Sequence, residues 1–367
     1  MKVLAILQSY DRNDPAVGFV VRWMEAMAQR VDKLMIMALL VAEHSPHSNI
    51  EVLSLGKESL KGPFRRLRYL LRWHRNIRKA ISQKPDLIFT HMTPIYSVLA
   101  APYAYWSGIP IITWFSYPGM RPTLATRLCY RVSKSILSIH QKTYPHPTHD
   151  KVIGLGHGID TDLFSPNQKL LDGPPIILCV GRVAQSKNHL ILIEALRQMA
   201  QSGRVFKCLI LGNVLEKDRE YYDRVKAAIS DSELSDIVEL VGAVPNHLLP
   251  DWYRRATVHV DACHILDKTN LEAMASGIPV LAPRGTNDRF LSPWENQLLF
   301  DNTNPEELSQ RLENILDMPE AERKEIGSTL RQRIEADYSL NRLSDRIVKV
   351  FHENAVISFL LASCTFL

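Results

Sequence analysis

The strongest constraint on the fold is an alternation of short apolar runs with longer segments of helical pattern. In the first half of the chain the runs are "KVLAIL", "KLMIMALL", "IEVLSL", "DLIFT", "PIITWF", "SILSI" and "KVIGLG". Because they are apolar at successive positions, these runs are typical of strands buried on both faces of a parallel sheet. The segments between them are long enough for crossover helices. The first half is therefore predicted to form an open α/β sheet.

A second sheet is predicted after a break in this pattern. The stretch "FSPNQKLLDGPP", residues 164–175, is rich in proline, glycine and polar residues, as expected of a linker. The alternation resumes with "IILCVG", "FKCLILG", "VELVGA", "VHVDA" and "IPVLAP". We therefore expect two Rossmann-like domains, residues 1–165 and 174–339. Ligands of such sheets bind at the carboxyl ends of the strands, so the two domains are expected to face each other across a cleft.

The uncharged segments do not predict a membrane span. Residues 87–120 contain no Asp, Glu, Lys or Arg, but Pro94, Pro102, Gly108 and Pro110 divide them into pieces shorter than the ~20 residues that a span needs. The uncharged last 13 residues are also too short. We expect residues 340–367 to form a helix that packs on the first domain.

Two features of the chain predict a cytoplasmic protein. The apolar run at the N-terminus is only about five residues long, which is too short for a signal peptide. The five cysteines are scattered without any C-x-x-C pair, and we expect them to be reduced and buried.

Two cations stand at the end of a predicted strand in "CVGRVAQSKNHLILIEAL". Arg182 and Lys187 lie five positions apart, around a loop that begins with Gly181 and leads into a helix. A glycine allows close approach to the backbone, and a helix N-terminus favours anions. Arg182 and Lys187 could therefore hold one diphosphate. Two surface cations on a solvated loop would give the same spacing.

A second candidate element is "LEAMASGIPV", in which Glu272 begins a short helix that Gly277 ends. A glutamate in the first helical turn often only compensates the helix dipole. It could alternatively accept hydrogen bonds from ribose hydroxyls, as acidic residues do in dinucleotide folds.

Together these segments resemble a known family. "GR-x4-K", followed about eighty residues later by "LEAMASGIPV", is similar to the retaining glycosyltransferases of family 4, which have the GT-B fold. "VIGLGHGIDTDLFSP" resembles the family's strand into the interdomain linker, and "DLIFTHM" resembles the strand that places a histidine in the cleft. The resemblance implies an N-terminal acceptor domain and a C-terminal domain that binds the nucleotide-sugar donor.

The resemblance also implies roles for individual residues. Arg182 and Lys187 would bind the donor diphosphate, with Gly181 in their loop, and Glu272 would hold the ribose. The backbone amides of Asn270 and Leu271 would meet the phosphates. Gly242, Ala243 and Val244 would face the base, and His91 would approach the reacting sugar. A histidine after a strand is otherwise often an ordinary hydrogen-bonded loop residue.

This chain departs from the family pattern in one catalytic motif and one loop. The family usually has two glutamates separated by seven residues, but the first position here is His264, which we keep with the donor-binding residues. Asp267 and Lys268 follow closely, and either could make the missing sugar contacts. The first loop, "QSYDRNDPAVGF", has Gly18 in place of a double glycine, so Gly18 is the remaining donor-binding candidate there. We see no D-x-D motif or histidine cluster dedicated to a metal, and no cofactor is expected.

The basic charge is concentrated in one segment. The chain has a net charge of +5, and between Lys57 and Lys84 there are ten Lys or Arg and one acidic residue. "PFRRLRYLLRWHRNIRKAIS" predicts a helix with one apolar stripe, Phe64, Leu67, Leu70, Leu71, Ile77 and Ile81, and one basic stripe, Arg65, Arg68, Arg72, Arg75 and Lys79. Such a helix suits an anionic membrane surface. A solvated outer helix is the alternative, and nucleic acid is disfavoured because Tyr69 and Trp73 alone make no stacking platform.

The sequence therefore predicts a cytoplasmic, peripherally membrane-bound glycosyltransferase. It would move a sugar from a nucleotide-sugar to a lipid-linked or envelope glycan acceptor, and retention of the anomeric configuration is implied only by the resemblance. A non-catalytic GT-B protein that binds nucleotide-sugar or glycan is one alternative, suggested by the missing glutamate. A sugar-nucleotide epimerase is another.

Overall fold

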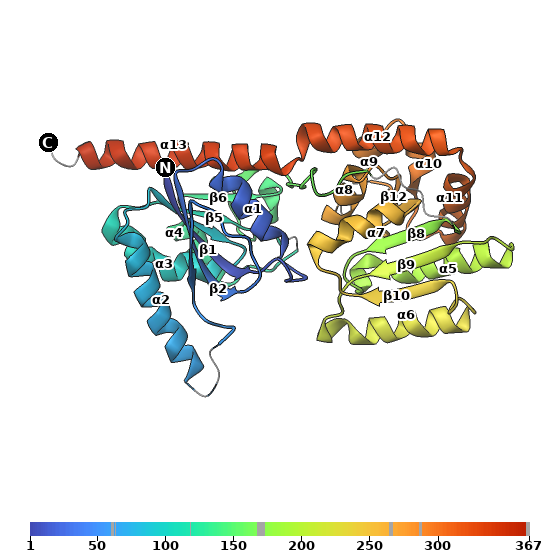
Figure 1. The fold of residues 1–367 in the computed structure, drawn as a ribbon, viewed down its shortest axis with the longest axis horizontal. Helices are drawn as coiled ribbons and strands as arrows, with labels where there is room; N and C mark the ends of the chain where they lie inside the picture. Colours follow the sequence, from blue (N-terminus) through green and yellow to red (C-terminus); the bar gives the residue numbers. More distant parts are fainter. Residues whose placement is uncertain are drawn as a thin grey trace. The chain divides into compact units, whose positions relative to one another are not determined.

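The computed structural model of the chain describes residues 1–59, 62, 64–117, 119–166, 173–263, 267–285 and 288–364. For Arg65, Arg289 and residues 356–364 only the backbone is described. The chain forms two compact units (Figure 1). Unit 1 is Met1–Gly158 together with the segment from Leu340 onward, and unit 2 is Ile159–Ser339.

Unit 1 contains a parallel sheet that confirms the seven predicted strands. Within the described residues the strand order is β3-β2-β1-β4-β5-β6-β7. The strands are β1 Lys2–Tyr10, β2 Lys33–Val41, β3 Ile50–Ser54, β4 Leu87–His91, β5 Ile111–Trp114, β6 Ser135–Ser138 and β7 Val152–Gly154. All of the pairings are parallel, as the continuous apolar runs indicated.

Helices cover both faces of this sheet because successive strand residues point to opposite sides. Val3, Ala5 and Leu7 of β1 pack with α1 (Phe19–Ala28) and α13 (Leu340–Cys364). Leu4 and Ile6 pack on the other face with α2 (Arg65–Ile81) and α3 (Pro94–Ser107). The remaining helix, α4 (Leu124–Val132), contributes Cys129 and Tyr130 to a smaller cluster at the β6–β7 side of the sheet.

The predicted C-terminal helix packs on unit 1, as expected. In α13 the side chains of Leu343, Ile347 and Phe351 are buried. The Phe351 ring lies 5.3 Å from the Phe89 ring of β4, measured between centroids. Among the described residues, none of the helices combines the length and the apolar character needed to cross a bilayer.

Unit 2 contains a second parallel sheet, with the strand order β10-β9-β8-β11-β12-β13 in its described part. The strands are β8 Ile176–Val180, β9 Lys207–Leu211, β10 Val238–Gly242, β11 Val258–Val260, β12 Val280–Pro283 and β13 Leu299–Phe300. The sequence pattern predicted the first five and missed β13, because a strand of two residues carries no periodicity. The order reverses between β8 and β11, which is the usual place for a ligand in such sheets.

The helices of unit 2 build a single core with the sheet. Helix α5 packs against α6 and α11, and α8 packs against α12. The helices are α5 His189–Gln201, α6 Arg219–Asp231, α7 Leu249–Arg255, α8 Lys268–Ala275, α9 Asp288–Leu291, α10 Glu295–Leu298, α11 Pro305–Asp317 and α12 Glu320–Asp337.

The boundary between the units lies earlier than the predicted end of the first domain at residue 165. The chain enters unit 2 at Ile159, whose N–H donates to the carbonyl of Tyr338 at 2.7 Å. The Arg331 guanidinium donates to the carbonyls of Thr161 and Phe164 at 3.2 and 2.8 Å. Hydrogen bonds to the backbone of residues 159–165 therefore attach this segment to unit 2, and amino-acid composition does not reveal these bonds.

Only the second half of the predicted apolar stripe of α2 faces the core. Trp73, Ile77 and Ala80 are buried, whereas Phe64, Leu67, Leu70 and Leu71 are each more than half exposed. The first half of α2 extends away from the sheet of unit 1, so no strand lies beneath it (Figure 1). The predicted stripe is therefore divided: Ile77 packs on the sheet, and the apolar residues of the first half of the helix are exposed.

Candidate functional site

The loops that follow β8 and β9 approach each other closely at the carboxyl edge of the unit 2 sheet. A Cβ on Gly212 would lie 1.8 Å from the carbonyl oxygen of Gly181, so only glycine is accommodated there. A Cβ on Gly181, which has φ of +153°, would lie 3.3 Å from Cε of Lys187. The Lys187 stem therefore packs along the glycine backbone.

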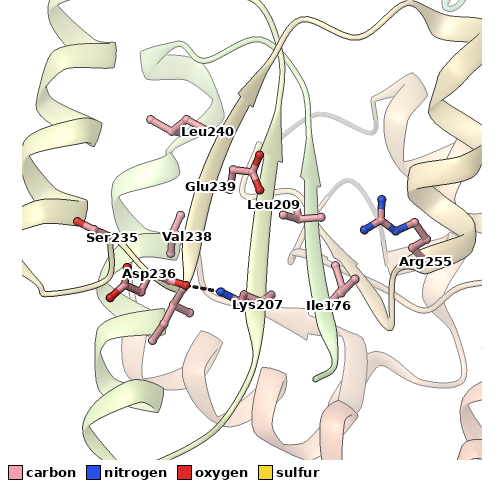
Figure 2. Close-up of a pocket in the computed structure, with 10 residues that line it drawn as sticks. Ile176, Lys207, Leu209, Ser235, Asp236, Val238, Glu239, Leu240 and Arg255 are labelled. Atoms are coloured by element: carbon pink, nitrogen blue, oxygen red, sulfur yellow. Dashed lines mark hydrogen bonds between the residues drawn. The ribbon is translucent and has the colours of Figure 1, made fainter. Parts of the chain in front are cut away.

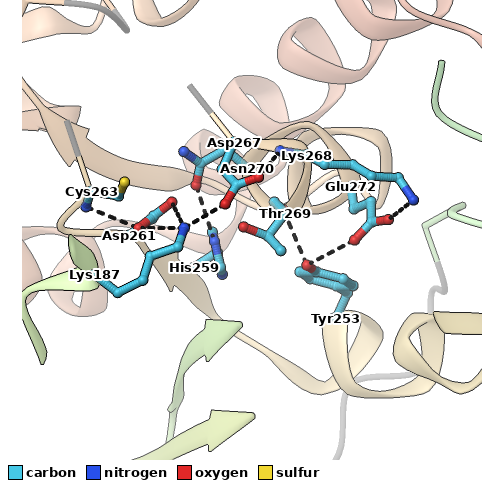
Figure 3. Close-up of polar contacts among 10 residues, drawn as sticks. All are labelled: Lys187, Tyr253, His259, Asp261, Cys263, Asp267, Lys268, Thr269, Asn270 and Glu272. Carbon is cyan, nitrogen blue, oxygen red and sulfur yellow. Dashed lines mark hydrogen bonds and ion pairs between the residues drawn. The ribbon is translucent and has the colours of Figure 1, made fainter. Parts of the chain in front are cut away.

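Lys187 is the centre of the site, and two carboxylates share its ammonium group (Figure 3). Nζ of Lys187 lies 2.5 Å from Oδ2 of Asp267 and 3.2 Å from Oδ2 of Asp261. The side chains of Lys187 and Asp261 are only 11% and 3% exposed, whereas that of Asp267 is 38% exposed. Asp261 also accepts a hydrogen bond from the N–H of Cys263 at 3.0 Å. Asp261 is thus held in place, and Asp267 closes the site toward solvent.

The electrostatics of this cluster keep the lysine charged. Burial lowers the pKa of Lys187, but the carboxylates of Asp267 and Asp261 outweigh burial and raise it above its ordinary value. Burial raises the pKa of Asp261 above the usual range, against the attraction of Lys187. Lys187 can therefore act as a fixed positive charge for an anionic ligand.

Helix α8 begins at this cluster. Asp267 is its N-cap residue, and Oδ1 of Asp267 accepts a hydrogen bond from the N–H of Lys268 at 2.6 Å. The helix N-terminus and the Lys187 ammonium, two groups that favour anions, therefore meet at one carboxylate.

Glu272 is buried one turn further along α8 and has several partners (Figure 3). Its carboxylate lies 3.1 Å from Nζ of Lys268, accepts a hydrogen bond from Asn246 at 2.9 Å, and lies 3.5 Å from the Tyr253 hydroxyl. Asn246 follows β10 closely, so the loop after β10 and helix α8 meet at Glu272. The contact therefore places the segment with the predicted base-binding residues, 242–244, next to the predicted ribose-binding residue Glu272.

The backbone of α8 is anchored below the site. The Asn270 side chain faces inward, and Oδ1 of Asn270 lies 3.1 Å from Nε2 of His259 on β11. Burial lowers the pKa of His259 to about 3, so its ring is neutral at pH 7 and donates this hydrogen bond. Asn270 and Leu271 are both buried, and the N–H of Leu271 donates to the carbonyl of Asp267 at 3.4 Å, so their predicted contacts with the phosphates stay predictions.

The other predicted residues of unit 2 lie at the same sheet edge or outside the described part. Arg182 follows Gly181, and Nε of Arg182 lies 3.5 Å from a carboxylate oxygen of Asp218. Gly242 ends β10, and its carbonyl accepts a hydrogen bond from the N–H of Gly212 at 2.8 Å. Ala243 and Val244 follow directly, with Ala243 exposed. His264 lies outside the described residues.

His91 and Gly18 belong to unit 1, and their predicted roles toward the donor stay predictions. His91 ends β4 and is only 3% exposed, with its ring centroid 5.8 Å from that of Trp23 and 6.4 Å from that of Phe19. Burial lowers its pKa to about 3. Gly18 precedes α1, where a Cβ would lie 2.5 Å from the carbonyl oxygen of Arg12.

A separate cavity of about 580 Å³ lies at the opposite end of the unit 2 sheet (Figure 2). Its lining includes Ile176 and Lys207, the first residues of β8 and β9, and Arg255 at the end of α7. The Lys207 ammonium donates to the carbonyl of Asp236. This cavity is therefore distinct from the cluster around Lys187, which lies at the carboxyl ends of the strands.

Sequence reasoning missed three residues of the site: Asp261, Asn246 and Tyr253. One signal for Asp261 was present, because it is an ionisable residue directly after the apolar run "VHV" at the carboxyl end of a strand. Asn246 and Tyr253 act through contacts with Glu272 that depend on tertiary structure.

Unit 2 is similar to a known protein family. Residues 160–333 match the model of the glycosyl transferases group 1. The match covers a little less than half of the chain, which therefore resembles this family. The matched residues cover nearly all of unit 2 and include every residue placed around Lys187 and Glu272.

Two curated relatives are named for an activity. It is 29% identical over 136 residues to the lipopolysaccharide core biosynthesis mannosyltransferase LpcC of Rhizobium leguminosarum bv. viciae, covering 34% of this chain and 38% of the relative. It is 24% identical over 264 residues to a GDP-mannose-dependent monoacylated alpha-(1-6)-phosphatidylinositol monomannoside mannosyltransferase of Corynebacterium glutamicum, covering 65% and 67%. The chain spans about half or less of the length of the first curated relatives it matches.

A solved structure shows the fold of the whole chain. Sucrose-phosphate synthase from Thermosynechococcus elongatus has a TM-score of 0.74 at 18% identity, covering 97% of this chain and 100% of that one. The predicted GT-B fold, with two Rossmann-like domains, is confirmed.

Proposed function

We propose that this protein transfers a sugar from a nucleotide-sugar to a lipid-linked or envelope glycan acceptor, with retention of the anomeric configuration. The observation that carries the proposal is the charged, largely buried Lys187 beside Gly181–Arg182 and the N-terminus of α8. These groups lie at the carboxyl edge of a parallel sheet, at its topological switch point. Retention follows from the family resemblance.

The proposed chemistry requires stabilisation of a leaving diphosphate. Cleavage of a sugar–phosphate bond leaves negative charge on the diphosphate and positive charge on the sugar. Lys187 and Arg182 would hold the first charge, together with the backbone amides of Asn270 and Leu271. Fixed cations of this kind can stabilise the leaving diphosphate without a metal ion. The proposal therefore includes neither a metal nor a cofactor.

On the sugar side, the contacts favour Asp267 over Lys268. The Lys268 ammonium lies 3.1 Å from Glu272, whereas Asp267 is the more exposed member of the Lys187 cluster. Asp267 would therefore make the sugar contact that the absent first glutamate makes in the family. Glu272 would hold the ribose, and Gly242, Ala243 and Val244 would face the base.

The acceptor class rests on the relatives. One is named for lipopolysaccharide core synthesis, and the other for a phosphatidylinositol mannoside. Both names refer to a glycolipid. We therefore propose that this chain also acts on a lipid-linked or envelope glycan and works at the cytoplasmic face of a membrane.

Helix α2 is the proposed membrane contact, with a composition that differs from the predicted basic stripe. Lys79 pairs with Glu51 at 2.9 Å, and the Arg72 guanidinium packs against Gly56. The exposed face instead combines apolar side chains with cations: Phe64, Leu67, Leu70 and Leu71 with Arg66, Arg68, Arg75 and Arg78. Such a face suits an anionic bilayer, because the apolar side chains can enter the headgroup region while the cations meet lipid phosphates.

The transferase proposal is tested by product analysis. The purified chain is incubated with UDP-, GDP-, ADP- and dTDP-sugars and a membrane lipid extract. We expect release of one nucleoside diphosphate together with an equal amount of sugar in the lipid fraction, and NMR of the product gives its anomeric configuration. An altered sugar still attached to its nucleotide would indicate an epimerase. Binding without turnover would indicate a non-catalytic protein.

A further inference from the structure

The site around Lys187 carries too much negative charge for a diphosphate ligand. Four ion pairs surround it: Lys187 with Asp261, Lys187 with Asp267, Arg182 with Asp218, and Lys268 with Glu272. Three cations thus face four carboxylates. Even if Asp261 were protonated, the net charge would only reach zero. A donor diphosphate is strongly anionic, so its binding requires a rearrangement of these carboxylates.

The two carboxylates on Lys187 differ in how readily they could leave. Asp261 is almost fully buried, follows the central strand β11, and is held by the N–H of Cys263. Asp267 is 38% exposed and sits at a helix terminus. A ligand can therefore displace the Asp267 carboxylate from Lys187, whereas the Asp261 carboxylate stays in place.

Asp267 also imitates a phosphate in its contacts. One oxygen lies 2.5 Å from the Lys187 ammonium, and the other accepts a hydrogen bond from the first N–H of α8 at 2.6 Å. An ammonium group and a helix N-terminus are the two groups that bind phosphates most often in α/β folds. Both are engaged by one side-chain carboxylate.

We infer that Asp267 holds the place of a donor phosphate and that a bound diphosphate displaces it from Lys187. Asp261 stays behind as a positioning residue that keeps the Lys187 ammonium at the sheet edge. Displacement frees the Asp267 carboxylate to reach the donor sugar. The exchange couples diphosphate binding to delivery of the sugar-contacting carboxylate, and it rests on the proposed transferase function.

Asp267→Asn is the decisive variant. Asparagine is an equally good N-cap residue and has nearly the same shape, so the helix is retained while the competing charge is removed. Calorimetric titration with UDP, GDP, ADP and dTDP should show binding at least about tenfold tighter than wild type for whichever nucleotide the wild type binds. Turnover of the matching nucleotide-sugar should fall, because the sugar contact is lost.

Two controls separate local exchange from a general charge effect. Asp251→Asn on α7 removes an exposed carboxylate that pairs with Arg254 and should leave nucleotide binding unchanged. Asp267→Glu keeps the charge and should not tighten binding.

Unchanged or weaker nucleotide binding by Asp267→Asn would overturn the exchange but leave the donor site in place. Equal tightening by Asp251→Asn would overturn it as well. If the wild type binds none of the four nucleotides, the proposed function fails and the exchange fails with it.

Discussion

At the residue scale, Lys187 and Arg182 have the same proposed task but different structural consequences. Lys187 is the partner of a buried carboxylate, whereas Arg182 makes a more exposed pair with Asp218 at 3.5 Å. Removing one member of a buried pair leaves an uncompensated charge and costs about 3–5 kcal/mol, while a surface pair contributes about 0–1 kcal/mol. The two cations are therefore distinguishable by stability as well as by binding.

We predict that Arg182→Ala and Lys187→Ala both weaken nucleoside-diphosphate binding, and that only Lys187→Ala destabilises unit 2, by roughly 3 kcal/mol. Adding Asp261→Asn to Lys187→Ala should recover a large part of this loss, because the buried charge is then removed. Urea unfolding of the wild type, Lys187→Ala, Asp261→Asn and the double variant forms a double-mutant cycle that measures the coupling. Equal stability of Arg182→Ala and Lys187→Ala would contradict the buried pair.

Three buried histidines make stability depend on pH. Burial lowers the pKa of His91 and of His259 to about 3, and burial together with Lys187 lowers that of His189 to about 4. In the unfolded chain each titrates near pH 6.5. Below that pH the unfolded state therefore binds more protons than the folded state, so stability is lost as the pH falls from about 6.5 toward 4.

We predict that each histidine costs roughly 2 kcal/mol of stability between pH 7 and pH 5, at about 1.4 kcal/mol per pH unit below 6.5. Urea unfolding at both pH values measures the loss. His91→Phe should lower the pH dependence of unit 1 and leave that of unit 2 unchanged. A pH dependence of unit 1 that is the same with and without His91 would show that this ring is not buried in the neutral form.

At the element scale, α2 presents two faces with separate tasks. Trp73, Ile77 and Ala80 bind it to the sheet of unit 1. Its exposed face includes the apolar residues of its first half and several of its arginines. A dimer formed by pairing this face with its own copy would bring like charges together, which disfavours a protein partner of that kind. Charge attraction alone would be screened at high salt, but inserted apolar side chains would not be.

We predict that the chain binds vesicles containing phosphatidylglycerol and that part of this binding persists in 1 M salt. Leu67→Ser with Leu71→Ser should lower the salt-resistant part by about tenfold or more, because each buried leucine contributes about 1.5–3 kcal/mol. Co-sedimentation measures the bound fraction.

The matched control for this prediction is Leu124→Ser, which changes an exposed leucine on α4 of the same unit and should bind as the wild type does. Wild-type binding by the double serine variant would remove α2 from the membrane proposal. Binding that 1 M salt abolishes completely would leave only the electrostatic contact.

At the scale of the whole molecule, the C-terminal helix returns to the unit in which the chain began. Leu343, Ile347 and Phe351 of α13 are buried in the core that they share with α1 and β1. Unit 1 therefore depends on residues more than 180 positions beyond its last strand, whereas unit 2 is continuous in sequence. The two units should differ in their response to truncation.

We predict that a chain ending at Ser339 keeps a folded unit 2 and loses the unfolding transition of unit 1, because several large side chains leave its core at about 2–5 kcal/mol each. Calorimetry and limited proteolysis followed by mass spectrometry measure this. A chain ending at Ala355, which retains Leu343, Ile347 and Phe351, should keep both transitions. A stable unit 1 in the chain ending at Ser339 would show that α13 is not part of its core.

Much of this architecture follows from local patterns. Continuous apolar runs identified twelve parallel strands, because a strand buried on both faces must be apolar at every position. Gly181, Arg182 and Lys187 were proposed as site residues because they follow a strand, and the structure places them at the carboxyl edge of the sheet. Glu272 was expected to begin its helix but lies one turn inside α8, which begins at Lys268. The segment that begins at Leu340 was correctly placed in a helix whose residues up to Phe351 pack on unit 1.

Other features depend on contacts between distant residues. The pairing of Lys187 with Asp261 and Asp267 joins positions up to 80 residues apart, so no local period or spacing contains it. The unit boundary at Ile159 depends on a hydrogen bond to Tyr338. The outward apolar face of α2 depends on how far the sheet beneath it extends. Periodicity reports which side chains share a face, whereas burial and charge pairing depend on what the rest of the chain places against that face.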